Sequence, residues 1–169
     1  MKKLKMTVVL AALFFTTASV QAQDYKTGIG LRLGGYTSGI SVKSFLGSVN
    51  AIEGIAGFGY HSFVVTGLYE HHIPIKGAAG LSFYPGAGIH MGFFAYNGTY
   101  RVYKNRGEHI YVVDEGTSAV VPGIDGVLGL EYKFNNAPLS LGLDIHPFID
   151  VYSGASMYVD GALSFRYVF

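Results

Sequence analysis

The sequence predicts an all-β protein, an up-and-down antiparallel barrel of about eight strands that spans a membrane. Hydrophobic residues make up 50% of the chain and charged residues only 14%, yet no apolar run after residue 22 approaches the ~20 residues of a spanning helix. The 24 glycines disfavour helices, whereas the 13 tyrosines and 12 phenylalanines favour strands. Apolar residues also recur at every second position, which is typical of strands with one apolar face.

The first residues predict a cleaved signal peptide at 1–22. Lysines occupy positions 2, 3 and 5, and an apolar run follows over residues 6–15. This three-part layout ends in small side chains at Val20-Gln21-Ala22, as signal peptidase requires. The apolar run of about ten residues is too short to cross a membrane. We therefore expect export and cleavage near Ala22, which leaves residues 23–169 as one barrel domain.

Alternation begins with the first expected strand. There Tyr25 and Ile29 fall on an apolar face, while Lys26 and Arg32 fall on a face of small or charged residues. The same pattern recurs along the chain, and the even strand number is typical of bacterial barrels. The expected strands are residues 25–34, 37–46, 51–60, 63–75, 81–93, 118–134, 139–151 and 157–169.

The connections between these strands agree with a membrane barrel. Such barrels have short turns on the periplasmic side, where both termini lie, and longer loops outside. The strand order places 47–50, 75–79 and 135–138 on the periplasmic side, and all three are short. The one long connection, residues 97–117, falls on the outside and is rich in charge.

The composition of the second face separates a membrane barrel from a soluble one. A soluble barrel needs many Lys, Glu, Asp, Asn and Gln on its solvated face. Here that face is mostly Gly, Ser and Ala with a few charges, which suits the narrow lumen of an eight-stranded barrel. We therefore expect the apolar face to meet lipid. A soluble periplasmic lipocalin-like barrel that binds a ligand is the alternative.

Charged residues on the lumen face are expected to pair, because an unpaired buried charge is costly. Closure of the barrel brings the first strand beside the last, so Arg32 and Asp160 are expected neighbours. We interpret the set as a salt-bridge plug rather than a conduit or an open pore. The lumen-facing charges are Lys26, Arg32, Lys43, Glu53, Glu70, Asp125, Glu131, Lys133, Asp144, Asp150, Asp160 and Arg166. The principal salt-bridge candidates among them are Lys26, Arg32, Glu53, Glu131, Asp144, Asp160 and Arg166.

The chain ends on alternating aromatics, with Phe165, Tyr167 and a terminal Phe169. This ending resembles the C-terminal signal by which the barrel assembly machinery recognises its substrates. The whole mature chain resembles the small OmpA/OmpX-like outer-membrane barrels of Gram-negative bacteria. The resemblance implies contact with outer-membrane lipids and a role in envelope structure or in surface interaction through residues 97–117. The outer loops between the first two expected strands and after Tyr60 are very short, whereas adhesive members often have long ones, which weakens the transfer of an adhesive function.

An enzyme of the same fold is a second alternative, since some eight-stranded outer-membrane barrels are lipid A acyltransferases or deacylases. Their chemistry needs an activated hydroxyl beside a histidine and an acid. The nearest approximations are His61-Ser62 and Ser82 with His90, and neither has a His-x-Ser motif with a supporting acid. We expect no catalytic site.

We also expect no metal, cofactor or nucleic-acid partner. Glu70-x-His72 and Asp144-x-His146 each place an acid and an imidazole on one face, but alternation creates such pairs by chance. Gly28-x-Gly30 does not complete a G-x-G-x-x-G motif. The net charge of +1 does not suit nucleic acid, and the absence of cysteine from the sequence excludes disulfides and thiol chemistry.

Overall fold

The computed structural model describes residues 25–59, 61–96, 100–103, 108–111, 117–151 and 155–169. The predicted signal peptide, residues 1–22, lies outside the described residues and stays a prediction. Within the described part of the chain, no helix is long and apolar enough to cross a membrane.

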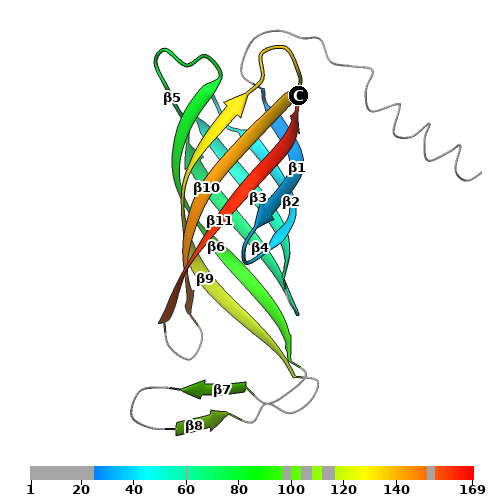
Figure 1. The fold of residues 1–169 in the computed structure, drawn as a ribbon, viewed down its shortest axis with the longest axis vertical. Helices are drawn as coiled ribbons and strands as arrows, with labels where there is room; N and C mark the ends of the chain where they lie inside the picture. Colours follow the sequence, from blue (N-terminus) through cyan, green and yellow to red (C-terminus); the bar gives the residue numbers. More distant parts are fainter. Residues whose placement is uncertain (1–24, 60, 97–99, 104–107, 112–116, 152–154) are drawn as a thin grey trace, which may run out of the picture.

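Eight antiparallel strands form a closed barrel (Figure 1), which confirms the predicted fold class. Each strand pairs with the next along the chain, and β1 pairs with β11 to close the ring. The barrel strands are β1 (Thr27–Gly34), β2 (Ser38–Phe45), β3 (Asn50–Gly59), β4 (Ser62–His71), β6 (Leu81–Tyr96), β9 (Thr117–Lys133), β10 (Leu139–Val151) and β11 (Ala155–Val168).

Three short strands lie at the margins of this barrel. The predicted strand 63–75 is interrupted after His71, and its last part is β5 (Ile73–Pro74), which pairs with β6. Strands β7 (Tyr100–Tyr103) and β8 (Glu108–Tyr111) form a separate two-stranded hairpin within the long connection between β6 and β9.

The two ends of the barrel differ, and we name them the turn end and the loop end. The turn end carries the C-terminus and the connections 46–49, 72–80 and 134–138, whereas the loop end carries the β7–β8 hairpin (Figure 1). The turns are closed by backbone hydrogen bonds, for example from Phe134 N to Leu139 O at 3.0 Å. All three connections predicted to lie on one side therefore do so.

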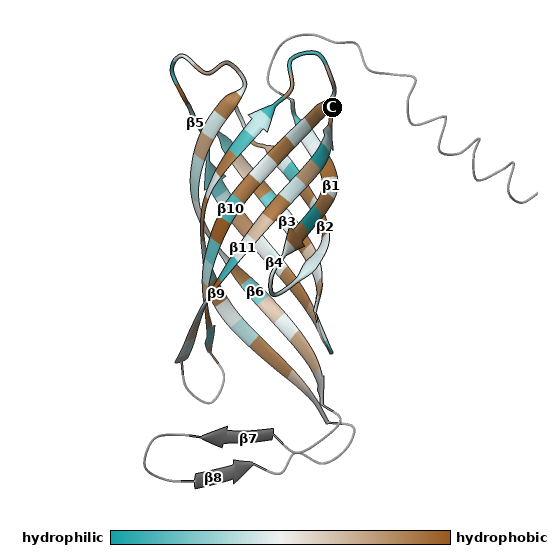
Figure 2. Cartoon of the chain, in the orientation of Figure 1, coloured by the Kyte–Doolittle hydropathy of each residue, from teal (hydrophilic) through white to brown (hydrophobic). Residues whose placement is uncertain are grey.

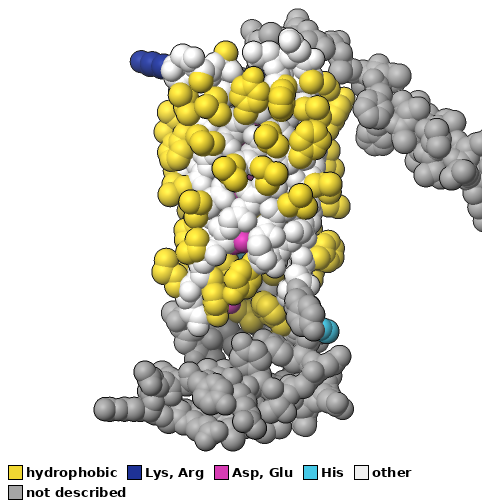
Figure 3. Space-filling model, viewed as in Figure 1, with side chains coloured by type: hydrophobic (Ala, Val, Ile, Leu, Met, Phe, Trp, Pro, Cys, Tyr) yellow, Lys and Arg dark blue, Asp and Glu magenta, His cyan; other side chains and the backbone are white. Residues whose placement is uncertain are grey.

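The wall of the barrel is apolar outside and polar inside. Leu143 is 60% exposed and Met157 is 69% exposed, although both are hydrophobic. Hydrophobic side chains cover the visible barrel surface in Figure 3, and hydropathy alternates along the strands in Figure 2. The apolar core within the lumen is small, consisting of Ile55, Leu68, Tyr84 and Val127. This arrangement is the reverse of a soluble protein, in which apolar side chains pack inside.

The residues just before β1 depart from the expected alternation of apolar and polar side chains. Lys26, expected in the lumen, is exposed, while Tyr25, expected on the apolar face, is buried in the lumen. The amides of Lys26 and Thr27 both donate to Phe169 O, at 3.1 and 2.9 Å. Two successive residues thus oppose one carbonyl, as in a bulge, which shifts the alternation by one residue.

Candidate functional site

Five charged side chains meet inside the barrel near the turn end, and we name them the turn-end cluster: Lys43, Glu53, Glu70, Glu131 and Arg166. Lys43 Nζ lies 3.1 Å from Glu53 Oε2, 2.7 Å from Glu70 Oε2 and 3.3 Å from Glu131 Oε2. Arg166 Nη2 donates to Glu53 Oε1. Every member is buried. Two cations therefore hold three carboxylates drawn from three different strands.

Aromatic rings surround this cluster. Tyr25 Oη donates to Glu131 Oε1 at 2.6 Å, and Lys43 Nζ lies 4.3 Å from the centroid of the Tyr84 ring. His72 stacks on Tyr84 with centroids 4.8 Å apart, and its Nε2 lies 2.9 Å from Glu70 Oε2. These rings and their hydrogen bonds leave the charges in a tightly packed, water-poor setting, in which ion pairs are strong.

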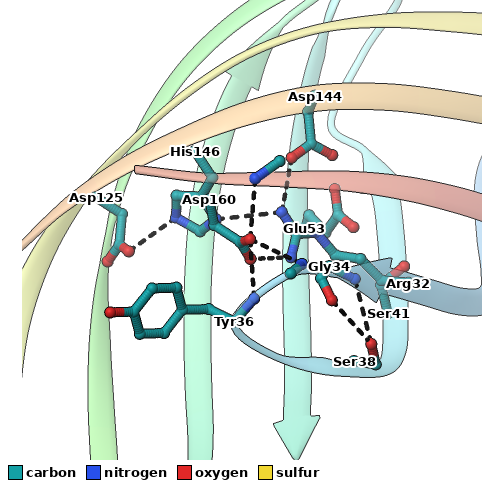
Figure 4. Close-up of polar contacts among 12 residues, drawn as sticks. Arg32, Gly34, Tyr36, Ser38, Ser41, Glu53, Asp125, Asp144, His146 and Asp160 are labelled. Atoms are coloured by element: carbon teal, nitrogen blue, oxygen red, sulfur yellow. Dashed lines mark hydrogen bonds and ion pairs between the residues drawn. The ribbon is translucent and has the colours of Figure 1, made fainter. Parts of the chain in front are cut away.

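A second group of charges, the loop-end cluster, lies nearer the opposite end: Arg32, His90, Asp125, Asp144, His146, Asp150 and Asp160. Figure 4 shows the part of this cluster around Arg32, which contacts three of the other members. Its Nη2 donates to Asp144 Oδ1 at 2.6 Å and lies 3.3 Å from His146 Nδ1, while its Nη1 is 3.9 Å from Asp160 Oδ2. The side chain of Arg32 joins strands β1, β10 and β11 across the interior.

The two histidines extend this cluster toward β6 and β9. His146 Nε2 lies 2.8 Å from Asp125 Oδ1. His90 Nδ1 lies 2.9 Å from Asp125 Oδ2, and His90 Nε2 lies 3.0 Å from Asp150 Oδ1. The side chain of Asp125 is 2% exposed and that of Asp150 is 22% exposed. The cluster is therefore closed at its centre and partly open at Asp150.

Asp160 also fixes the short connection between β1 and β2. Its Oδ1 accepts hydrogen bonds from the backbone amides of Gly35 at 2.9 Å, Tyr36 at 3.0 Å and Gly161 at 2.9 Å (Figure 4). Charge-assisted hydrogen bonds of this kind are stronger than neutral ones. Asp160 thus acts on the backbone of the loop end as well as on Arg32.

The structure brings most of the predicted salt-bridge candidates together, but with partners that the sequence did not specify. Arg32 and Asp160 are neighbours as expected, although Asp144 lies closer to the guanidinium. Lys26 lies outside both clusters. Lys43, a lumen charge left out of the principal candidates, is central to the turn-end cluster. The candidates buried in the lumen are Arg32, Glu53, Glu131, Asp144, Asp160 and Arg166.

The C-terminal aromatics lie at the turn end of β11. Phe165 and Phe169 are exposed on the outer surface, at 48% and 64%. The rings of Tyr167 and Phe169 lie 6.2 Å apart. Their position beside the first residues of β1 fits an interfacial anchor, and recognition by an assembly machinery stays a prediction.

Ser82 and His90, one of the two hydroxyl and histidine combinations considered for catalysis, do not meet. Ser82 Oγ lies 3.5 Å from His72 Nδ1 in the turn-end region, whereas His90 belongs to the loop-end cluster. His61 is an exposed residue with a φ of 54° in the connection between β3 and β4, next to Ser62. Ser82 contacts a different histidine, His72, whose Nε2 lies 2.9 Å from Glu70 Oε2. The 3.5 Å contact of Ser82 Oγ is at the long limit of a hydrogen bond, and Glu70 is also bound by Lys43 at 2.7 Å.

The acid and imidazole pairs considered for metal binding form hydrogen bonds and ion pairs with other side chains of the lumen or with each other. Glu70 and His72 are in contact with each other, but Asp144 and His146 both face Arg32. Among the residues that the structure describes, no group of three or more acids and histidines has a geometry that could hold a metal ion.

The fold is similar to that of a solved β-barrel domain. No protein-family model and no curated protein matches the chain. The N-terminal β-barrel domain of Pseudomonas aeruginosa OprF superposes with a TM-score of 0.59 at 16% identity, covering 86% of this chain and 99% of that domain. Neisserial surface protein A gives a TM-score of 0.48 at 11% identity, covering 85% of this chain and 94% of that protein. The chain thus has the closed eight-stranded fold of the OmpA-like barrels, as its resemblance to the OmpA/OmpX-like class implies.

Proposed function

We propose that this protein is a non-enzymatic barrel of the Gram-negative outer membrane, with a role in envelope structure. The inverted wall is the observation that carries the proposal. Exposed Leu, Ile, Val and Phe side chains occur on every barrel strand from β1 to β11. Soluble monomers rarely expose apolar side chains around their whole surface, whereas this distribution suits the apolar band by which outer-membrane barrels contact lipid.

The lumen supports a plugged barrel rather than a pore or a ligand carrier. Its two charge clusters cross the interior from strand to strand, and Tyr84 lies between them. Tyr84 Oη donates to Asp144 Oδ2 at 3.5 Å, while its ring contacts Lys43 and His72. A lipocalin-like carrier would need an apolar cavity here, but the structure has ion pairs.

The loop end supports a second part of the proposal, presentation of a surface to an extracellular partner. Strands β6 and β9 remain paired as far as Tyr96 and Thr117, whereas β4 and β6 last pair at Ser62 and Phe94, and β9 and β10 last pair at Gly123 and Asp150. The β6–β9 pair therefore extends past both of its neighbours and leads to the β7–β8 hairpin (Figure 1). We infer that the hairpin is held away from the membrane surface, where a partner could reach it.

Cell fractionation tests the location. The full chain is expressed in a Gram-negative host, and the outer-membrane fraction is run on a gel with and without boiling. A detergent-extracted band that migrates faster before boiling supports a closed membrane barrel. A band in the soluble periplasmic fraction would refute the proposal. Planar-bilayer recordings should show no steady conductance, because the lumen is filled. A variant that lacks residues 100–111 should still migrate as a heat-modifiable outer-membrane band and still show no conductance, but it should lose binding to any extracellular partner.

A further inference from the structure

The contacts of His90 differ from those of the other histidine in the loop-end cluster. Both ring nitrogens of His90 face carboxylates, with Nδ1 2.9 Å from Asp125 Oδ2 and Nε2 3.0 Å from Asp150 Oδ1. A neutral imidazole has one donor and one acceptor nitrogen, whereas an ionised carboxylate only accepts. Both contacts can be hydrogen bonds at once only if both nitrogens carry hydrogen.

We propose that His90 is a proton-binding site, an imidazolium that joins β9 and β10 at the loop end and makes the closure of this end depend on pH. In this arrangement the bound proton is the ligand. It converts one ring nitrogen from an acceptor that opposes a carboxylate into a donor that bonds to it. The proposal rests on the lumen geometry and does not depend on a partner for the hairpin.

His146 can be compared with His90, because its contacts require hydrogen on only one ring nitrogen. Its Nε2 lies 2.8 Å from Asp125 Oδ1 and must donate to it. Its Nδ1 lies 3.3 Å from Arg32 Nη2, which has donors only, so Nδ1 must accept. The form of His146 that satisfies both contacts therefore carries hydrogen on Nε2 alone. A second proton on His146 would place two cations face to face.

A glycine makes the His90 contacts possible. In the register, Gly123 of β9 lies opposite His90 of β6 on one side and opposite Asp150 of β10 on the other. A Cβ atom at Gly123 would overlap the imidazole ring. Because Gly123 has no side chain, the ring extends over β9 and reaches Asp150 two strands away. Phe148 packs edge-on against the ring, with centroids 5.6 Å apart.

The charged groups around His90 determine which contact is lost with the proton. Strand β9 supplies Asp125 and β10 supplies Asp150, while the register neighbour on β4 is the uncharged Thr66. Asp150 is the more exposed carboxylate and can be hydrated, whereas Asp125 is also held by His146. Deprotonation at high pH should therefore release Asp150 first and loosen the end of β10, while lower pH keeps it closed.

Nitrogen NMR of the refolded full chain tests the proposal. The chain is labelled with ¹⁵N-histidine in lipid nanodiscs, and signals are assigned by their loss in His90→Gln and His146→Gln variants. At pH 7 we expect two protonated ring nitrogens in His90 and one in His146. One unprotonated ring nitrogen in His90 at pH 7 would overturn the proposal.

A variant of Asp150 and a control variant test the role of this carboxylate. Asp150→Asn should lower the proton affinity of His90 by roughly tenfold, because a bonded carboxylate is lost. Lys76→Met is the control, since it also changes the charge of the protein by one but lies exposed at the turn end, and it should leave the His90 titration unchanged. Equal titration of His90 in the wild type and in Asp150→Asn would contradict the assignment.

Discussion

The two charge clusters of the lumen are built from similar residues but have different chemistry. At the turn end, Lys43 and Arg166 hold three glutamates, and all of these groups are buried. At the loop end, Arg32 is the one permanent cation in a cluster with four aspartates. It pairs with Asp144 and Asp160, and histidines contact the other two. The turn-end cluster is therefore held by permanent cations, whereas the contacts of His90 at the loop end depend on a bound proton.

The cations of the two clusters hold different numbers of carboxylates. Lys43 Nζ lies within 3.3 Å of three glutamates, whereas Arg32 lies 2.6 Å from Asp144 and 3.9 Å from Asp160. Because removal of one partner of a buried ion pair leaves an uncompensated charge, the loss of Lys43 should cost more than the loss of Arg32.

The largest effect is expected for Lys43→Met. The substitution leaves three buried glutamates with Arg166 as the remaining cation of the cluster, so the free energy of unfolding should fall by about 3–5 kcal/mol. Urea titration in lipid vesicles measures this change. The control is Lys76→Met, because Lys76 is exposed in the turn between β5 and β6, and it should change stability by less than about 0.5 kcal/mol. Similar losses of unfolding free energy in Lys43→Met and Lys76→Met would show that the buried ion pairs of Lys43 do not stabilise the barrel.

A smaller effect is expected for Arg32→Met. The loss of its hydrogen bond to Asp144 should cost about 2 kcal/mol, and Asp160 retains its three backbone amide donors. The same urea titration applies. A loss equal to or greater than that of Lys43→Met would show that the loop-end cluster is not the weaker of the two.

The smallest effect concerns coupling between the clusters. Tyr84 contacts both, but its hydroxyl lies 3.5 Å from Asp144, which is a long hydrogen bond. The costs of Lys43→Met and Arg32→Met should therefore add to within about 0.5 kcal/mol in the double variant. A coupling energy well above this value would mean that the lumen responds as one unit, and Tyr84→Phe should then abolish the coupling.

Much of the fold could be predicted because the alternation of apolar and polar residues can be recognised within each strand by itself. Residues such as Leu141 and Leu143 identify an outward face without any tertiary knowledge, and strand order fixes the side on which each turn lies. The error at Lys26 and Tyr25 arose because a local bulge against Phe169 shifts the alternation, and no composition signal marks that bulge.

The pairing inside the lumen was less predictable. The neighbours Lys43 and Glu53 follow from the register of β2 and β3, but the contacts of Lys43 with Glu70 and Glu131 cross the interior. Such contacts depend on the tilt and stagger of the closed barrel. The contact between His90 and Asp150 depends further on the missing side chain of Gly123, which the sequence alone marks only as a strand glycine.

The most direct test of the inverted wall uses the absence of tryptophan from the sequence. Leu143→Trp places the reporter on the outer face of β10, and Tyr84→Trp places it in the lumen. Both variants are folded into vesicles that contain brominated lipid, and fluorescence quenching is measured. If the apolar wall faces lipid, Leu143→Trp should be strongly quenched and Tyr84→Trp weakly quenched. Equal quenching, or stronger quenching of Tyr84→Trp, would contradict a lipid-facing apolar wall around a polar lumen.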